Sequence, residues 1–374
     1  MLFSTSSVFI TLIMSTIMIL LFNLLIVQKK CIRFLKMDIM ILLALVITVR
    51  LIFPFEFFFT ITIPFPLIMN GLKEFFEYRV FLDFTILQCL CFIWITGSCM
   101  QALKYLYSMK KCYRTLYVLQ QEAEHRSVTD YLKIDSKYNY KVWISPKIDS
   151  PMVIGLKKII LLPKINLPAS ELQEILKHEI QHIRNHDNFI KQVINILKII
   201  YWWFPPLYWF SNQMQLALEM RVDQQVTKGY TKSQVYDYAS VLIKLKQMMI
   251  KQQNLLSVTL PLSSNFLIGD HEKVLSYRIH YLLESNYRKK TSFLLLFIIL
   301  LLPFISNSIV LEAYFPPPLK NYTSYPANAI EESFILEHKN GSYSLFVNGT
   351  LTKINDPNNK KYSNLPVIKE SDNK

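Results

Sequence analysis

This sequence of 374 residues has few glycines, and its cysteines follow no recognisable spacing. Each of these features excludes some classes of protein. With only seven glycines, the chain contains no glycine-rich phosphate loop. The five cysteines form neither a disulfide framework nor a C-x-x-C metal site. Zinc-finger spacing and aromatic RNA-binding motifs are absent as well. These absences argue against a nucleotide-binding enzyme of the phosphate-loop type, a disulfide-rich secreted domain and a direct nucleic-acid binder.

What the sequence does contain is apolar residues, which make up 52% of it and occur in clusters. This clustering indicates a membrane protein. The formal net charge is +14, which fits either nucleic acid or an anionic membrane surface. Basic residues gather beside the apolar runs, and we therefore expect the partner of this charge to be membrane lipid.

Four apolar runs have the length of a membrane crossing, at residues 8–27, 39–59, 81–100 and 292–311. A signal peptide is a poor interpretation of the first run, because its basic residues follow it and no small-residue cleavage site appears. Basic clusters follow the first and third runs and precede the fourth run. The last of these clusters consists of Arg278, Arg288, Lys289 and Lys290. The positive-inside rule then places the amino terminus and the tail after residue 311 outside the cell, and residues 116–290 in the cytoplasm.

The sequence thus predicts a mainly α membrane protein with an inserted α+β domain. The predicted parts are a three-span region at 1–115, a cytoplasmic domain at 116–290, a fourth span at 291–311 and a short extracellular tail at 312–374. We expect a short external loop at 60–80, a helix at 118–136 and strands at 140–145 and 158–162. Two Asn-Gly pairs between alternating runs predict a small β-meander in the tail. The aromatic run at 194–210 predicts a helix end and turn, lying either at the bilayer interface or in an ordinary core.

The most informative stretch is residues 170–187, SELQEILKHEIQHIRNHD. It contains an H-E-x-x-H motif, in which His178 and His182 share one helix face and can bind a single zinc ion. Glu179 can then act as general base toward a water molecule that the zinc activates. Ser170 and Gln173 fit a capping box at the helix start. This amphipathic context favours zinc over the alternative of incidental histidines on a partly exposed helix.

A catalytic zinc site needs a third protein ligand and one open position. Glu219 and Asp223 lie at i and i+4 on a downstream helix, far enough from His182 for that helix to fold back. We expect Glu219 to reach the metal and Asp223 to orient a histidine. His186 is a rival ligand, but a third member of an i+4 series fits a tetrahedral site poorly. His186 and Asp187 are therefore expected to act locally or behind the ligands.

At this point the sequence resembles the BlaR/MecR-type β-lactam-sensing signal transducers, which are integral-membrane gluzincin peptidases. The resemblance covers about residues 1–311. Its matching segments are DSPMVIGLKKIILLP (149–163), HEIQHIRNHD (178–187), IIYWWFPPLYW (199–209) and ALEMRVDQQV (217–226). It implies that His178, His182 and Glu219 bind Zn²⁺ and that Glu179 is the base. One departure is that Arg221 and Val222 stand where the family usually has a small residue and a cysteine.

A second departure follows the fourth predicted span, where only 63 residues remain and no penicillin-binding domain is expected. The S-x-x-K sequence at Ser371 stands at the extreme end of the chain and is interpreted as coincidence. The resemblance implies a zinc endopeptidase of the bacterial cell membrane that cleaves a cytoplasmic transcriptional repressor, itself, or both. It also implies a self-cleavage segment at residues 254–270. A second copy of the chain is an expected partner. The alternatives are a membrane peptidase that processes peptides or lipoproteins without sensing, and a catalytically silent receptor.

Overall fold

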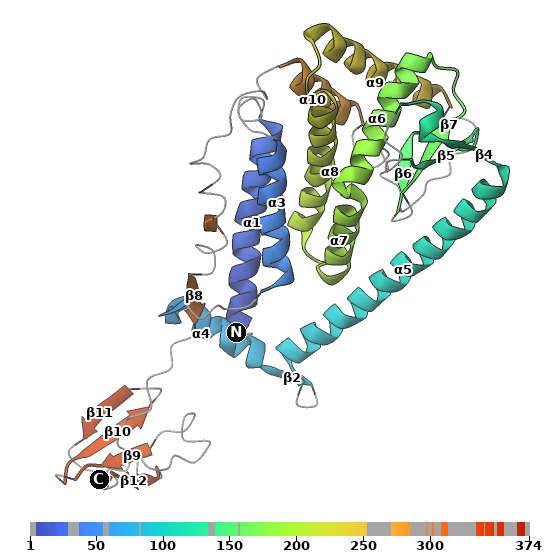
Figure 1. The fold of residues 1–374 in the computed structure, drawn as a ribbon. Helices are drawn as coiled ribbons and strands as arrows, with labels where there is room; N and C mark the ends of the chain where they lie inside the picture. Colours follow the sequence, from blue (N-terminus) through green and yellow to red (C-terminus); the bar gives the residue numbers. More distant parts are fainter. Residues whose placement is uncertain are drawn as a thin grey trace. The chain divides into compact units, whose positions relative to one another are not determined.

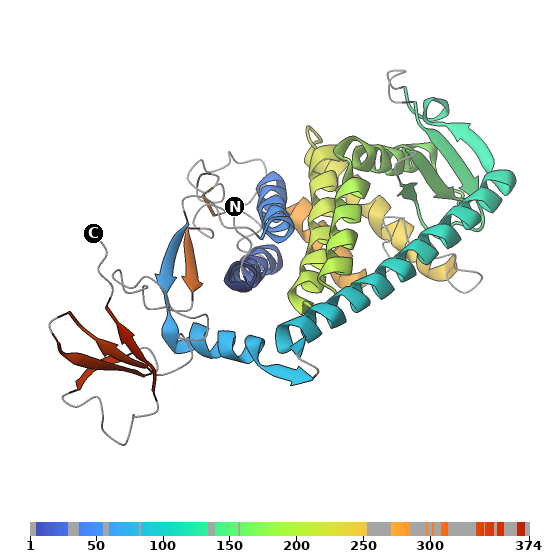
Figure 2. The ribbon, with the colours of Figure 1, turned by 90° about the horizontal axis from the view of Figure 1, so that it is seen from below.

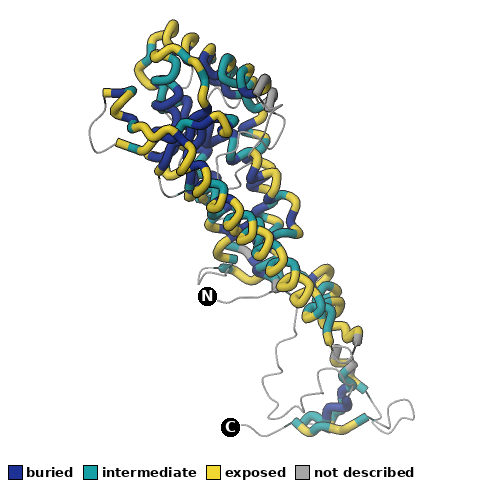
Figure 3. The backbone as a smooth tube through the Cα atoms, turned by 90° about the vertical axis from the view of Figure 1, so that its right-hand side faces the viewer, coloured by how far each residue is buried: buried dark blue, intermediate teal, exposed yellow. Residues whose placement is uncertain are grey.

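The computed structural model describes residues 5–28, 37–54, 60–81, 84–133, 139–155, 158–252, 271–284, 297, 301–302, 308–312, 334–339, 341–347, 350–354 and 365–370. The chain forms two compact units. The first comprises Met1–Ile63 and Glu74–Leu311, and the second comprises Pro64–Lys73 and Glu312–Lys374. Buried residues concentrate where helices pack against one another and against a sheet (Figure 3). The candidate site residues all belong to the first unit.

Three helices of the first unit share one apolar core (Figure 1). They are α1 (Thr5–Val27), α3 (Met37–Ile52) and α8 (Pro205–Val226). The core residues that these helices contribute include Ile19, Phe22, Ile26, Met40, Leu43, Ile47, Leu207, Phe210 and Met214. The rings of Phe22 and Phe210 lie 5.4 Å apart between centroids. Helix α8 is therefore anchored to two of the helices that the sequence predicts as membrane spans.

Among the described residues, two helices are long and apolar enough to cross a membrane, at Ser6–Val27 and Ile86–Glu122. They correspond to the first and third predicted spans. Helix α5 (Ile86–Glu122) continues well past residue 100, where the sequence predicts the third span to end. Helix α3 has only 16 residues, and residues 55–59 of the second predicted span lie outside the described residues. Most of the fourth predicted span, 292–311, also lies outside them.

The predicted external loop at residues 60–80 contains secondary structure that the sequence analysis did not predict. This segment contains β1 (Ile61–Pro64), α4 (Pro66–Glu77) and β2 (Arg79–Phe81). Strand β2 pairs with β3 (Phe84–Thr85), and β1 pairs with β8 (Ile309–Glu312). The prolines that suggested a loop have another role here, because Pro66 occupies the first position of a helix, where its missing N–H leaves no bond unmade.

A four-stranded sheet follows α5 (Figure 2). Its strand order is β4-β5-β7-β6. Its strands are β4 (Glu124–Ser127), β5 (Lys141–Ser145), β6 (Met152–Ile154) and β7 (Ile159–Pro163). Strands β5 and β7 are parallel, and the other two pairs are antiparallel. The predicted strands at 140–145 and 158–162 are thus confirmed. The predicted helix at 118–136 is wrong beyond Glu122, because β4 pairs with β5 there and a 3-10 turn, Val128–Asp130, follows.

Within the described residues, four further helices lie around α8 in the first unit. They are α6 (Ala169–Asn185), α7 (Asp187–Ile200), α9 (Lys232–Gln252) and α10 (His271–Leu283). Helix α6 packs its apolar face on the sheet, with Leu176 and Ile180 against Val142 and Ile160. Helices α9 and α10 pack together through a smaller cluster that contains Leu282.

The aromatic run at 194–210 forms the end of α7, a turn and the start of α8. Tyr201, Phe204 and Phe210 are buried in the core shared with α1 and α3. Trp203 and Trp209 are exposed. The predicted helix end and turn are thus confirmed, and the core interpretation describes the buried side chains of this run. Its position at a bilayer interface stays a prediction.

The second unit contains a separate four-stranded sheet in the order β11-β10-β9-β12. Its strands are β9 (Phe334–Glu337), β10 (Tyr343–Val347), β11 (Thr350–Ile354) and β12 (Val367–Lys369). The antiparallel pairing of β9, β10 and β11 confirms the predicted meander. Strand β12 adds to it by parallel pairing with β9, which the sequence analysis did not predict.

Candidate metal centre

Helix α6 carries the H-E-x-x-H residues, and it begins differently from the prediction. Its N-cap is Pro168, whose carbonyl accepts a hydrogen bond from the Leu172 N–H at 3.1 Å. Ser170 lies inside the first turn and does not cap the helix. Gln173 donates instead to the Tyr131 carbonyl at 2.9 Å, which ties α6 to the segment after β4. The predicted capping box is wrong because tertiary contacts take up its glutamine.

The motif residues all lie on the buried side of α6. His178, Glu179 and His182 are 4%, 4% and 3% exposed. The two imidazoles stack edge to face with their centroids 4.8 Å apart, and their Nε2 atoms are 3.1 Å apart. The i, i+4 spacing therefore brings one nitrogen of each ring to the same point, as the sequence predicts.

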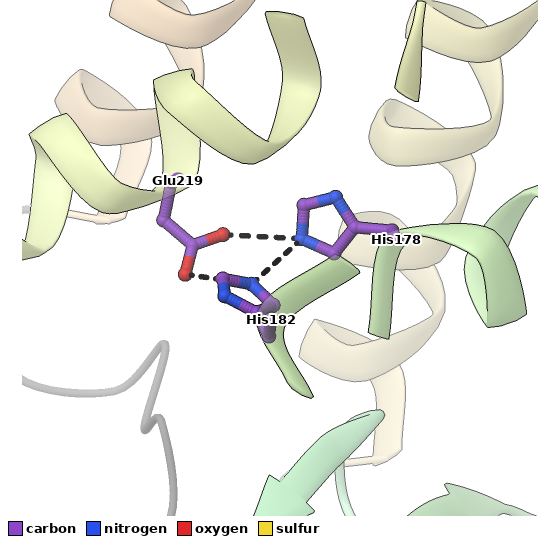
Figure 4. Close-up of side chains that lie close together, drawn as sticks. All are labelled: His178, His182 and Glu219. Carbon is purple, nitrogen blue, oxygen red and sulfur yellow. Dashed lines mark hydrogen bonds and ion pairs between the residues drawn. The ribbon is translucent and has the colours of Figure 1, made fainter. Parts of the chain in front are cut away.

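Glu219 reaches the same point from α8. Its Oε2 lies 3.3 Å from His178 Nε2, and its Oε1 lies 3.4 Å from His182 Nε2 (Figure 4). One donor atom from each of the three side chains lies within 4.8 Å of the other two. This is the only such group of metal-binding side chains in the part of the chain that the structure describes. The structure thus brings together the three residues that the sequence analysis expects as ligands.

The second nitrogen of each imidazole is held by a separate acceptor. His182 Nδ1 lies 2.6 Å from Asp187 Oδ2. His178 Nδ1 lies 2.9 Å from the Tyr238 hydroxyl, which itself donates to Asp223 Oδ1 at 2.8 Å. With both Nδ1 atoms donating, both Nε2 atoms present lone pairs. Two nitrogen lone pairs and a carboxylate that face one another need a cation or a proton between them.

His186, the rival ligand, lies outside this group. It adopts a left-handed conformation with φ 58° and joins α6 to α7. Its Nδ1 contacts the Ile183 carbonyl at 3.1 Å. This left-handed residue separates α6 from α7, and Asp187, the first residue of α7, places its carboxylate against His182 Nδ1. His186 therefore acts through its backbone conformation at the junction of α6 and α7, which agrees with the local role expected from the sequence.

Arg278 is a functional neighbour that the sequence analysis missed. It projects from α10 and has no exposed surface. Its Nε and Nη2 each donate to Asp223 at 2.7 Å, and its Nη1 lies 3.2 Å from Glu219 Oε2. The sequence analysis grouped Arg278 with basic residues that mark the cytoplasmic side of a span. A signal was present, because Leu275 and Leu282 flank it at helical spacing and place it on the apolar face of α10.

The charged groups shift one another's pKa values in ways that keep the carboxylates ionised. Burial by itself would raise the pKa of Glu219, but His182 and Arg278 hold that pKa well below its usual range. Burial opposes ionisation of Asp223 too, yet Arg278 lowers the pKa of Asp223 to about 2. Glu179 is different, because burial dominates and raises its pKa. The site therefore holds two ionised carboxylates beside one that retains a proton more readily.

The pKa of His182 is shifted in the opposite direction to the pKa values of Glu219 and Asp223. Burial would lower the pKa of His182, but Glu219 and Asp187 outweigh it and raise that pKa to about 10. In the absence of a metal ion, a proton thus occupies the place where a cation is favoured. A bound metal would have to displace that proton.

A pocket of about 190 Å³ lies beside His182 and strand β6. Its lining residues are Val153, Gly155, Lys158, His182, Ile183, His186, Asn188 and Phe189. Strand β6 is an edge strand of the sheet. The carbonyls of Val153 in this strand and of Gly155 directly after it accept hydrogen bonds from Asn188 Nδ2, at 3.1 and 3.3 Å. The candidate metal centre is therefore bordered by a sheet edge and a small cavity.

Comparison with known proteins gives a family match over this region. The sequence model of the BlaR1 peptidase M56 family matches residues 75–268. The regulatory protein BlaR1 of Bacillus licheniformis is 29% identical over 174 residues, which is 45% of this chain and 29% of that protein. The methicillin resistance mecR1 protein of Staphylococcus aureus is 29% identical over 193 residues, 49% of this chain and 31% of that protein. The chain thus matches about three tenths of the length of these relatives.

Proposed function

Because this chain belongs to the BlaR1 peptidase M56 family, we propose that it is a membrane-embedded zinc endopeptidase that acts in transmembrane signalling. One observation carries the proposal. His178, His182 and Glu219 converge from two helices with their donor atoms within 4.8 Å of one another. The similarity to the BlaR1 and mecR1 proteins supports the signalling role.

The donor set fits zinc in both type and charge. Two imidazole nitrogens and one carboxylate are the ligands of many catalytic zinc sites, which leave a fourth position open. Asp187, Glu219 and Asp223 bring three carboxylates to a buried cluster in which Arg278 is the guanidinium. The excess of negative charge favours a divalent cation. Bound zinc would supply Lewis-acid activation of water and of the scissile carbonyl.

Glu179 is the residue that we assign to proton transfer. It is buried beside the histidines, and its Oε2 has no hydrogen-bond partner in the described part of the chain. Its raised pKa brings the carboxyl closer to the range in which a group can both accept and return a proton. Glu179 would take a proton from the attacking water and pass it to the leaving amine.

Strand β6 and its pocket provide a place for a peptide substrate. An extended peptide can add to a sheet edge by main-chain hydrogen bonds. The carbonyls of Val153 and Gly155 accept hydrogen bonds from the Asn188 side chain. A bound peptide would donate its own N–H groups to these carbonyls in place of Asn188. A side chain of that peptide would then enter the pocket beside His182.

The proposed substrate is a cytoplasmic transcriptional repressor, the chain itself, or both. The two apolar helices at Ser6–Val27 and Ile86–Glu122 support insertion in a membrane. The complete arrangement that we propose has four spans, with the peptidase region in the cytoplasm and both chain ends outside. A second copy of the chain remains a proposed partner.

The function is tested by cleavage in cells that express the tagged wild type or Glu179→Gln. We expect fragments of the chain, or new amino termini in cytoplasmic proteins, in the wild type only. Glu174→Gln is the matched control, since Glu174 lies on the same helix but pairs with Lys177 and Tyr230 away from the site. Cleavage that survives in Glu179→Gln would contradict the assigned role of Glu179. Cleavage that is lost equally in Glu174→Gln would mean that the assay reports helix integrity.

A further inference from the structure

We propose that Arg278 is a positioning residue of the metal centre, so that helix α10 is part of the catalytic unit. The proposal rests on the metal binding proposed above. Residue 278 lies beyond the family match, which ends at residue 268. The amino-acid sequence of the H-E-x-x-H region and of the segment around Glu219 does not by itself predict a contribution from helix α10.

The contacts of Arg278 are those of a two-point clamp. Its guanidinium forms parallel hydrogen bonds with both oxygens of Asp223, at 2.7 Å each. Such a fork fixes the orientation of a carboxylate as well as its charge. The remaining nitrogen, Nη1, lies 3.2 Å from Glu219 Oε2. One side chain thus contacts the proposed carboxylate ligand and the carboxylate that stands behind His178.

Arg278 is linked to His178 through Asp223 and Tyr238. Asp223 Oδ1 accepts from the Tyr238 hydroxyl and lies 3.3 Å from His178 Nδ1. If Arg278 were removed, Asp223 would lose the two hydrogen bonds that fix the orientation of its carboxylate. The acceptor that aligns Tyr238 and His178 would then be weakened. Arg278 therefore acts on His178 through Asp223 and on Glu219 directly.

Two effects of Arg278 on metal binding oppose each other. Its positive charge near Glu219 repels a cation and competes for the carboxylate. Its two hydrogen bonds hold the buried carboxylate of Asp223 in one orientation before a metal arrives, and its Nη1 lies beside Glu219. Arg278 forms two hydrogen bonds of 2.7 Å with Asp223, whereas it makes one contact of 3.2 Å with Glu219. Orientation therefore outweighs repulsion, and loss of Arg278 should weaken metal binding.

Arg278 also contributes to packing, and the test has to separate that from positioning. Helix α10 is held by its own apolar residues, since Leu282 packs on α9 and Tyr281 joins the core shared with α1, α3 and α8. Arg278→Met keeps the length of the side chain and removes the clamp. Arg278→Lys keeps the charge and removes the fork. Arg278→Met combined with Asp223→Asn removes both buried charges, which protects the fold if the single variant does not fold.

The measurement is metal affinity of the purified chain in detergent, by competition of Zn²⁺ with a chromophoric chelator. A second readout is the visible spectrum of the Co²⁺ form, which reports ligand number and geometry independently of activity. We expect Arg278→Met to weaken Zn²⁺ binding by about 10–100-fold and to change the Co²⁺ spectrum. Arg278→Lys should recover only part of the affinity. The double variant should fold and still bind weakly.

The matched control is Arg221→Met, which removes a guanidinium from α8 itself. Arg221 is not one of the residues that meet at the centre, and its Nε lies 3.4 Å from Asp38 Oδ1. The Arg221→Met variant should bind Zn²⁺ with the affinity of the wild type. An unchanged affinity and spectrum in Arg278→Met, or in the double variant if only that folds, would overturn the positioning role. A wild type that binds no metal would instead overturn the proposed function.

Discussion

Removal of the Asp187 carboxylate should weaken metal binding without removing a ligand. Asp187 Oδ2 lies 2.6 Å from His182 Nδ1, and both groups are buried. This contact fixes the ring so that Nε2 faces His178 and Glu219. Loss of such a partner typically lowers metal affinity by about 10–100-fold, which corresponds to about 1.4–2.7 kcal/mol. We expect that loss for Asp187→Ala, and a smaller one for Asp187→Asn, whose amide oxygen can still accept the Nδ1–H.

The assay is chelator competition for Zn²⁺ on protein whose fold is checked by thermal melting. The neighbouring His186 provides the control, because His186→Asn removes an imidazole next to Asp187 and asparagine tolerates the left-handed backbone there. His186→Asn should bind Zn²⁺ with wild-type affinity. Equal affinity of Asp187→Ala and the wild type would refute the orienting role. A large loss in His186→Asn would mean that the rival ligand had been wrongly dismissed.

Three other predictions concern pH, self-cleavage and topology. The pKa of Asp223 is about 2 in the fold against 3.8 for the free side chain, so its ion pair stabilises the fold above about pH 4. About 2 kcal/mol should be lost as the pH falls from about 4 to about 2, and acid melts in detergent that show no loss there would contradict this value. Cleavage within residues 254–270, which lie outside the described residues, should yield fragments in the wild type that Glu179→Gln lacks. Protease treatment of intact cells should remove the tail after residue 311, and a fluorescent penicillin should not label the chain; a label lost in Ser371→Ala would contradict the second expectation.

The sequence predicted those parts of the site that local spacing determines. His178 and His182 share a face because they are four residues apart on a helix, and no tertiary information is needed for that. Glu219 was found because a carboxylate among apolar residues calls for a partner in a buried place. The sequence also named Asp187 and Asp223 as residues behind the ligands. The structure adds the Tyr238 hydroxyl between His178 Nδ1 and Asp223, which follows only from the position of α9.

Where the predictions failed, a distant segment changed a local preference. Gln173 fits a capping box by spacing, but the Tyr131 carbonyl is a closer partner in the fold. Residues 124–127 are polar enough for a helix end, yet the free edge of β5 takes them as a strand. Arg278 was counted as a surface charge because its partner, Asp223, lies far away in the sequence. Its place between Leu275 and Leu282 on one helix face would have indicated burial.

The metal content of the purified chain tests the central claim most directly. We expect about one zinc per chain in the wild type and in Glu179→Gln, and none in His178→Ala combined with His182→Ala. Membrane insertion should be the same in all three proteins, because the two histidines lie outside the apolar helices. Stoichiometric zinc in the double variant, or a wild type without metal at any zinc concentration that leaves it folded, would contradict the account.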